Sequence, residues 1–189
     1  MWARVPRGGK LWEASKGEPN RRALAELIGS GAAHALLAVS DQRVVGWCSL
    51  GPRAEFPRLE RVKAARSNWD EHTWSVVCFF IPARQRGRGV ASALLDAAIA
   101  YAREHGARVL EGYPVRSASG GDAKMPAAFA WTGVASMFQR RGFERASPSG
   151  ARELWRLEFD ARRERAAKTE RAPSADRGGG SRSRVERRR

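Results

Sequence analysis

The stretch Cys78-Phe79-Phe80-Ile81-Pro82-Ala83-Arg84-Gln85-Arg86-Gly87-Arg88-Gly89-Val90-Ala91 decides the fold of this chain. An apolar strand runs into a turn rich in arginine and glycine, and the turn opens directly into a helix. Apolar residues recur at helical spacing after the turn, at Val90, Leu94, Ala97, Ala98 and Tyr101. A further strand is predicted at Val109–Tyr113, so the strand–helix–strand order implies a right-handed parallel crossover.

The junction between turn and helix has the chemistry of an anion site. The first N–H groups of a helix have no partner within the helix and lie at the positive end of its dipole. Glycines such as Gly87 and Gly89 let a bulky ligand approach the main chain closely. We therefore expect a cradle for a pyrophosphate at this turn.

The spacing of the glycines excludes two well-known classes of phosphate-binding loop. The turn is neither the nucleoside-triphosphate loop G-x-x-x-x-G-K-S/T nor the dinucleotide pattern G-x-G-x-x-G. Instead, Arg86–Ala91 fits the pattern Q/R-x-x-G-x-G/A. With the strand before it, the helix after it, the next strand and a late Gly142-Phe143 pair, the chain resembles the GNAT superfamily of N-acetyltransferases over about residues 20–159. The alternative is a purely structural strand–turn–helix in a small basic protein.

This resemblance implies an acetyl-CoA site. In the family, backbone amides of the motif hold the pyrophosphate, and the end of the central strand binds the thioester carbonyl and the pantetheine amides. The cofactor-binding residues expected here are Phe79, Phe80, Ile81, Arg86, Gly87, Arg88, Gly89, Val90 and Ala91. The segments Val45–Arg53, Cys78-Phe79 and Glu111–Pro114 look like those of a bacterial branch of the superfamily.

The catalytic residues depart from the family pattern. An alkyl amine has a pKa of about 10.4 and must lose a proton before it attacks a thioester. The family often supplies an acid from a Tyr five residues before the late Phe, and this chain has Phe138 there, where a phenyl ring can only wall the thioester. Glu111, inside a predicted strand, is the favoured base, and Tyr113 is a replacement acid. Other carboxylate or imidazole candidates precede the central strand: Asp70, Glu71 and His72.

Several aromatic residues are assigned by position. Trp47, Trp74 and Trp155 lie on predicted strands and are expected in the core. Trp131 follows a loop rich in Gly, Ala and Ser, and it belongs either to the core or to the acceptor pocket.

Composition favours one domain with a basic tail. The 189 residues carry a net charge of +15, and 42% are hydrophobic, which suits a globular chain. Residues 160–189 hold 11 Lys/Arg and 5 Asp/Glu, a net charge of +6, against +9 for residues 1–159. We predict a catalytic domain at residues 1–159 and a largely disordered tail at 160–189, with a short helix at 161–168.

The remaining composition bears on compartment and metals. No apolar run approaches about 18 residues, and the start lacks the apolar region of a signal peptide. Cys48 and Cys78 are expected as buried thiols in a reducing cytoplasm, and the three histidines have no ligand spacing, so no metal is expected.

The expected fold is an α/β domain with a mixed sheet flanked by helices. Strands are predicted at 35–39, 43–50, 73–81, 109–113, 143–146 and 154–159, and helices at 21–28, 57–66, 89–105 and 131–141. The strand that usually opens the GNAT fold cannot be found before residue 35.

The function implied by the resemblance is acetyl-CoA-dependent acetylation of a primary amine. A small-molecule amine is the favoured acceptor, and a protein amine is second. Two alternatives are a GNAT-like protein that binds an acyl-CoA with little turnover, and a basic module whose Arg-rich tail binds nucleic acid. The expected protein is cytoplasmic and makes no membrane contact, and a homodimer is compatible with the sequence.

Overall fold

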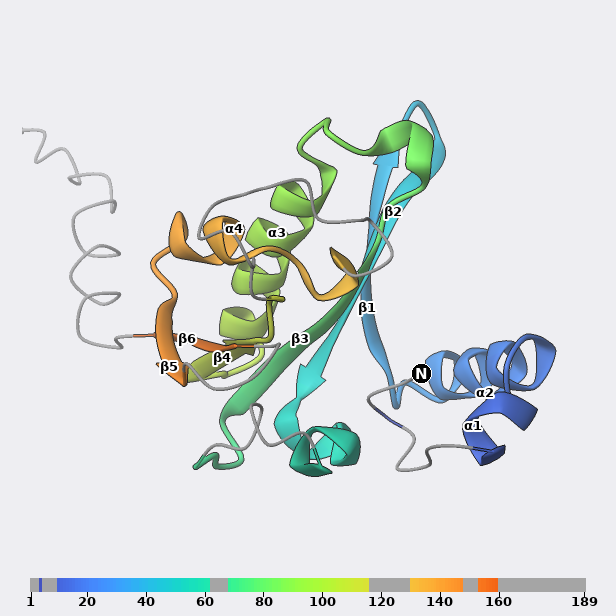
Figure 1. Ribbon diagram of the computed structural model, residues 1–189, viewed down its shortest axis with the longest axis horizontal. Helices are drawn as coiled ribbons and strands as arrows, with labels where there is room; N and C mark the ends of the chain where they lie inside the picture. Colours follow the sequence, from blue (N-terminus) through green and yellow to red (C-terminus); the bar gives the residue numbers. More distant parts are fainter. Residues whose placement is uncertain (1–3, 5–9, 62–67, 116–129, 148–152, 160–189) are drawn as a thin grey trace, which may run out of the picture. The chain divides into compact units, whose positions relative to one another are not determined.

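A computed structural model describes residue 4 and residues 10–61, 68–115, 130–147 and 153–159, which belong to one compact unit, Met1–Phe159. Its centre is a six-stranded sheet in the order β1-β2-β3-β4-β6-β5 (Figure 1). β3 and β4 are parallel, and every other neighbouring pair is antiparallel. The strands are β1 (His34–Ser40), β2 (Arg43–Pro52), β3 (Thr73–Phe80), β4 (Val109–Gly112), β5 (Glu144–Ser147) and β6 (Leu154–Glu158).

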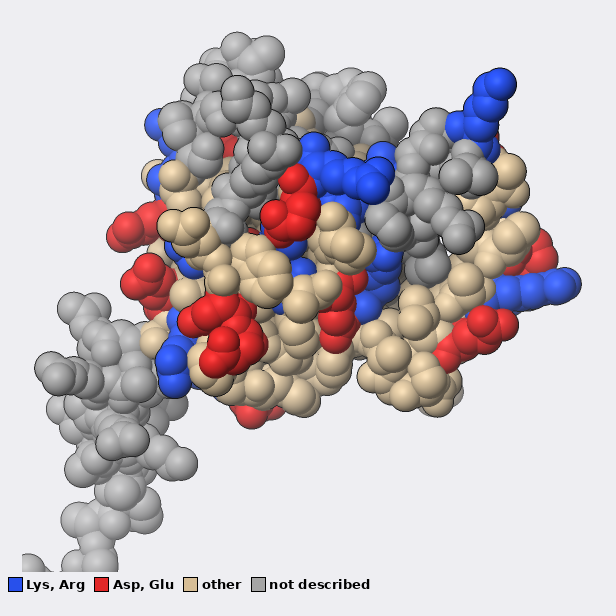
Figure 2. All heavy atoms as spheres, turned by 90° about the horizontal axis from the view of Figure 1, so that it is seen from below, with Lys and Arg blue, Asp and Glu red and all other residues tan. Residues whose placement is uncertain are grey.

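Two helices cover one face of the sheet. α3 (Val90–Glu104) and α4 (Ala135–Gln139) lie on the same side of the strands, whereas α1 (Lys10–Ala14) and α2 (Glu18–Gly29) lie beside the start of β1 (Figure 1). Short 3₁₀ turns connect the elements: η1 (Arg53–Glu55), η2 (Pro57–Arg61), η4 (Ala83–Gln85) and η5 (Ala130–Thr132). On the face seen in Figure 2, the described acidic and basic side chains are interspersed.

The predicted mixed α/β sheet is confirmed, and the differences lie at element ends. α1 falls in a stretch with no predicted element, and α2 begins at Glu18, because a proline is tolerated in the first helical turn. α4 is shorter than predicted, since Thr132 lies in η5 and Val134 is the N-cap. Among the described residues no strand precedes β1. The predicted tail helix, the tail's disorder and most of the 117–130 loop lie outside the described residues.

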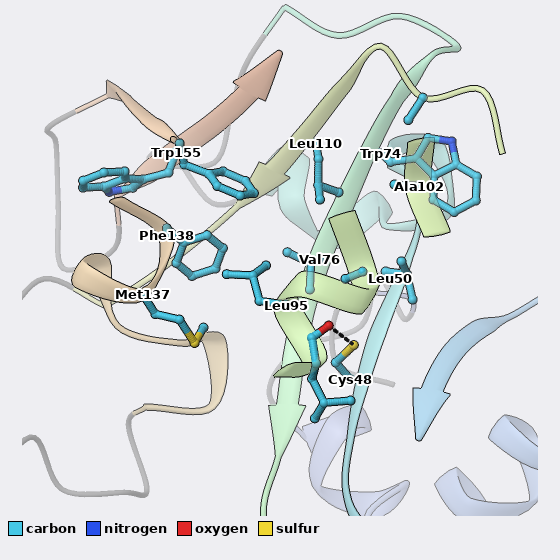
Figure 3. Close-up of a cluster of buried hydrophobic side chains, with 14 of the residues drawn as sticks. Cys48, Leu50, Trp74, Val76, Leu95, Ala102, Leu110, Met137, Phe138 and Trp155 are labelled. Carbon is cyan, nitrogen blue, oxygen red and sulfur yellow. Dashed lines mark hydrogen bonds between the residues drawn. The ribbon is translucent and has the colours of Figure 1, made fainter. Parts of the chain in front are cut away.

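The sheet separates two buried clusters. Between the sheet and α3 and α4 lies the larger one, which includes Cys48, Leu50, Val76, Leu95 and Phe138 (Figure 3). On the opposite face, a smaller cluster is formed by Phe56, Leu59, Val77, Tyr113 and Leu154.

A bulge in β3 determines which side chains reach which cluster. Ser49 pairs with Cys78 and Leu50 pairs with Val76, so Val77 is an extra residue on β3. Such an insertion reverses the alternation of the residues that follow it. Phe79 therefore returns to the α3 face with Val76, and Phe80 points to the opposite face.

The two cysteines differ in burial. Cys48 is fully buried, with its Sγ 3.9 Å from the Leu94 carbonyl oxygen, as predicted. Cys78 is only partly buried, and neither forms a disulfide. Burial raises the pKa of the Cys48 thiol to about 12.

This raised pKa predicts a loss of stability at alkaline pH. Between pH 9.0 and about 12 the unfolded thiol ionises while the folded thiol keeps its proton, so the free energy of unfolding falls as pH rises. The slope from one proton is at most about 1.4 kcal/mol per pH unit. Urea unfolding across this range should show a shallower fall for Cys48→Ala than for the wild type and for the control Cys78→Ala. Equal slopes for all three proteins would contradict the assignment.

Candidate active site

A wedge opens in the sheet where β3 and β4 separate. Their pairing ends at Val76 and Gly112, yet β3 continues to Phe80 beside β2. Beyond β4, Pro114 has no N–H to donate, and Val115 forms an isolated parallel bridge with Val134 instead. The last half of β3 therefore has no described strand on its β4 side.

A pocket of about 320 Å³ lies beside this end of β3. Its walls come from three places: the end of β3, the turn into α3 with the first residues of that helix, and the segment from η5 to α4. The lining residues are Phe79, Phe80, Ile81, Gln85, Arg86, Gly87, Gly89, Val90, Ala91, Ser92, Trp131, Gly133, Val134, Met137 and Arg140.

The turn into α3 leaves the helix N-terminus open. Gly89 is the N-cap with φ +79°, a left-handed conformation that other residues rarely adopt. A Cβ built at Gly89 would meet no atom within 4 Å, and no side chain of the described residues caps this helix. The first amides of α3 are thus available to an anion beside the pocket. Arg86 steadies the turn, because its Nε donates to the Ile81 carbonyl oxygen at 3.0 Å.

Arg141 attaches α4 to α3. Its guanidinium donates to both carboxylate oxygens of Asp96, at 2.5 and 2.8 Å, and to the carbonyl oxygens of Ser92 and Met137, both at 3.0 Å. These hydrogen bonds help to position Met137 and Arg140, which line the pocket. Sequence analysis missed this attachment between α3 and α4, because Asp96 and Arg141 are 45 positions apart.

Most of the residues predicted to bind the cofactor line this one pocket. Arg88 is the exception and is exposed. Trp131, assigned from the sequence to either core or pocket, lines the pocket. That the predicted cofactor-binding residues contact acetyl-CoA stays a prediction.

Phe138 lies in the core and is not among the pocket-lining residues. Its ring is fully buried (Figure 3). It forms an edge-to-face pair with Phe143, with centroids 5.1 Å apart. It covers the end of β4, where a Cβ on Gly112 would overlap the ring. The expectation that this phenyl ring walls the thioester is therefore wrong.

The predicted base and acid lie on the other face of the sheet, in a buried polar network. Tyr113 donates to Glu111 Oε2 at 2.8 Å, and Ser75 Oγ lies 2.8 Å from the Tyr113 hydroxyl. Arg53 Nε is 3.4 Å from Glu111 Oε2, and Arg156 Nε is 3.5 Å from Oε1. Burial, and then the negative charge of Glu111, raise the pKa of Tyr113 well above 10, so its phenol stays protonated at neutral pH.

The alternative candidates lie at the wrong end of β3. Asp70 accepts from Thr73 Oγ1 at 2.9 Å and from the His72 N–H at 3.0 Å, which closes the turn before the strand. The Thr73 hydrogen bond lowers the pKa of Asp70. Eight residues of strand, roughly 25 Å, separate this turn from the pocket end of β3. Asp70, Glu71 and His72 are thereby set apart from the pocket.

Comparison with known proteins identifies the family. Residues 9–116 match the model of the Acetyltransferase (GNAT) family. The match spans more than half of the chain, so the chain belongs to the GNAT acetyltransferases, as the Arg86–Ala91 motif and its surroundings predicted.

The chain is also similar to solved structures. PaiA N-acetyltransferase of Thermoplasma acidophilum, crystallised with coenzyme A, is 13% identical, with 84% of each chain covered and a TM-score of 0.50. Ribosomal-protein-alanine N-acetyltransferase of Brucella melitensis is 18% identical, with 74% of this chain and 77% of that chain covered and a TM-score of 0.49. No curated protein matches the chain.

The described residues contain neither a membrane span nor a metal-binding group. In the described parts of the chain, every helix is too short or too polar to cross a membrane. The same residues contain no group of three His, Cys, Asp or Glu side chains placed to hold a metal ion.

The burial of Phe138 predicts how a tyrosine would behave there. In Phe138→Tyr, the new hydroxyl enters an apolar core without a hydrogen-bond partner. The free energy of unfolding should therefore be about 1–3 kcal/mol lower than that of the wild type. Turnover should not rise, because the ring does not reach the pocket. Chemical unfolding and a thiol-release assay measure both quantities. Raised turnover with unchanged stability would show instead that the ring faces the thioester.

Proposed function

We propose that this GNAT acetyltransferase binds acetyl-CoA in the pocket beside β3 and acetylates a primary amine of a small molecule. The observation that carries this proposal is the open N-terminus of α3 at one end of the pocket. A pyrophosphate there would receive backbone N–H groups next to Gly89 and the favourable end of the helix dipole. The coenzyme A complex of the PaiA relative supports the same ligand class.

The rest of the pocket suits the remainder of that ligand. Arg86 and Arg140 lie on its walls and add positive charge for phosphates. Phe79, Met137 and Trp131 provide an apolar wall for the pantetheine arm. β3 runs past the end of its pairing with β4 at Val76, and Phe79 and Phe80 line the pocket, so the end of this strand lies where the amides of that arm would pass.

Acetyl transfer from a thioester to an amine requires few steps. Acetyl-CoA supplies an activated acetyl group as a thioester. The amine nitrogen forms a bond to the carbonyl carbon, the C–S bond breaks, and the proton lost by the amine is balanced by the one gained by the thiolate. An N–H of the separated part of β3 would stabilise the charge that develops on the carbonyl oxygen.

We assign the proton transfers to the network on the opposite face. Glu111 is the proposed base, and two guanidinium groups hold its oxygens in place. Tyr113, protonated and hydrogen-bonded to Glu111, is the proposed acid. Both groups are buried and neither lines the pocket, so this assignment requires a proton to reach them along the hydrogen bonds that join Ser75, Tyr113 and Glu111.

The described charges bear on the class of acceptor. On the face seen in Figure 2, acidic and basic side chains of the described residues are interspersed, so this face carries charge of both signs. The prediction that the basic tail binds nucleic acid concerns residues outside the described ones.

Two matched variants at Gly89 test the proposed pyrophosphate site. Asp and Asn have the same shape and both tolerate left-handed backbone, so Gly89→Asp differs from Gly89→Asn only by a negative charge at the pyrophosphate position. Calorimetry should show acetyl-CoA affinity at least about tenfold lower for Asp than for Asn, about 1.4 kcal/mol. Equal affinities for the two variants would place the pyrophosphate elsewhere.

The proton-transfer roles are tested by Glu111→Gln and Tyr113→Phe. Each keeps the shape of the side chain, so acetyl-CoA affinity should not change, whereas turnover should fall by roughly 10²–10⁴-fold for the base. Thermal unfolding is followed in parallel, because losing a buried charge partner also destabilises the fold. A destabilised Glu111→Gln enzyme with wild-type turnover would show that the network is structural only.

A further inference from the structure

Five apolar side chains form a continuous strip on the face of the sheet opposite α3, which we call the apolar row. In the register of the strands, Leu37 lies opposite Trp47, and Trp47 lies opposite Phe80. Val39 lies opposite Val44 closer to the hairpin turn. Directly paired residues project to the same face, so these side chains adjoin across β1, β2 and β3.

The apolar row is unusually exposed. Leu37 is 62% exposed, Val39 61%, Val44 55% and Phe80 53%. Trp47 is half-buried and belongs to neither buried cluster, so the expectation that it lies in the core is wrong, whereas Trp74 and Trp155 are buried as predicted. Contiguous exposed apolar surface marks a binding site more often than single exposed residues do.

The described helices leave this strip uncovered. Gly46, next to Trp47 in β2, faces Val90 and Leu94, which places α3 on the opposite side of the sheet. No residue of α2 is buried, and α2 lies beside the start of β1 (Figure 1).

The strip is continuous with the proposed reaction site. Phe80 belongs both to the apolar row and to the lining of the acetyl-CoA pocket. Two residues before it, Cys78 packs against the cluster that contains Tyr113. The apolar row thus runs from the hairpin to the pocket on the same face as Glu111 and Tyr113.

We propose that the apolar row holds the body of the acceptor, so that the substrates are primary amines carrying an aliphatic or aromatic group. This inference rests on the proposed function. An acceptor must approach the thioester, and the row is the surface that adjoins the pocket on the side of the proposed base. Three directly paired residues, Leu37, Trp47 and Phe80, span about 10 Å, the length of a phenylalkyl group or a medium alkyl chain.

The chemistry of the row disfavours polar acceptors. None of its five side chains carries a charge, and the charged residues of this hairpin, Asp41 and Arg43, lie at its turn beyond Val39. A second ammonium or a sugar hydroxyl placed on the row would lose water without gaining a partner. Polyamines and amino sugars should therefore be poor substrates.

The experiment measures kcat/KM at saturating acetyl-CoA for hexylamine, phenethylamine, putrescine, glucosamine and ethylamine. Hexylamine and phenethylamine should exceed putrescine and glucosamine by at least about tenfold. In Leu37→Asn, kcat/KM should fall severalfold for hexylamine and phenethylamine, while ethylamine, too short to reach Leu37, and acetyl-CoA affinity stay unchanged. Ile28→Asn is the matched control, because Ile28 is 52% exposed on α2, outside the row.

The possible results distinguish a failure of this inference from a failure of the proposed function on which it rests. Equal use of polar and apolar amines, or an equal loss for ethylamine in Leu37→Asn, would overturn the inference and leave the acetyltransferase proposal standing. Acetyl-CoA binding without acetylation of any amine would overturn the proposed function itself. A dimer in light scattering that Leu37→Asn dissociates with kcat/KM unchanged would show that the row is an interface between copies, which also overturns the inference.

Discussion

The short parallel pairing between β3 and β4 is the constraint on which the rest of the structure depends. It lasts four residue pairs and stops at Val76 and Gly112, because the chain after β4 turns to pair with Val134. β3 continues on that side without a described strand beside it and ends beside the N-terminus of α3. The bulge at Val77 then sets which face each of the next residues takes: Phe79 joins the core and pocket, and Phe80 reaches the apolar row. One register irregularity therefore shapes both the cofactor side and the proposed acceptor side.

Where β3 and β4 meet, the two faces of the sheet are stabilised by different kinds of interaction. One face is closed by apolar packing of Phe138 on Gly112, and the other holds a buried carboxylate between two guanidinium groups. Burying Glu111 is costly unless it is paired, and the desolvation of Arg53 adds to that cost. Packed hydrophobic residues would fill the same space with less penalty, so the presence of the network is consistent with the chemical role proposed for it.

Local signals predicted most of this fold, and long-range packing limited the rest. The strand–turn–helix unit was recognisable because the glycines, the apolar run and the helical spacing adjoin in sequence. Trp47 was assigned to the core because it lies on a strand, but its neighbours Cys48 and Leu50 take the α3 face, so Trp47 projects to the opposite face, which no described helix covers. Phe138 was assigned to the pocket from its position in the family motif, but a glycine at position 112 lets the ring pack inward. The ion pair between Arg141 and Asp96 joins the turn after α4 to α3, and no spacing rule connects the two positions.

The attachment of α4 by Arg141 has an evolutionary consequence. A helix of five residues does not persist without tertiary contacts. Besides its core packing, this wall of the pocket is attached to α3 by Arg141, which binds the Asp96 carboxylate and the Ser92 carbonyl oxygen on α3 and the Met137 carbonyl oxygen within α4. The carbonyl partners are backbone and survive any substitution, whereas the Asp96 carboxylate does not. Among descendants of a common ancestor, positions 96 and 141 should therefore change together, and the pair would mark lineages that keep α4 in this place.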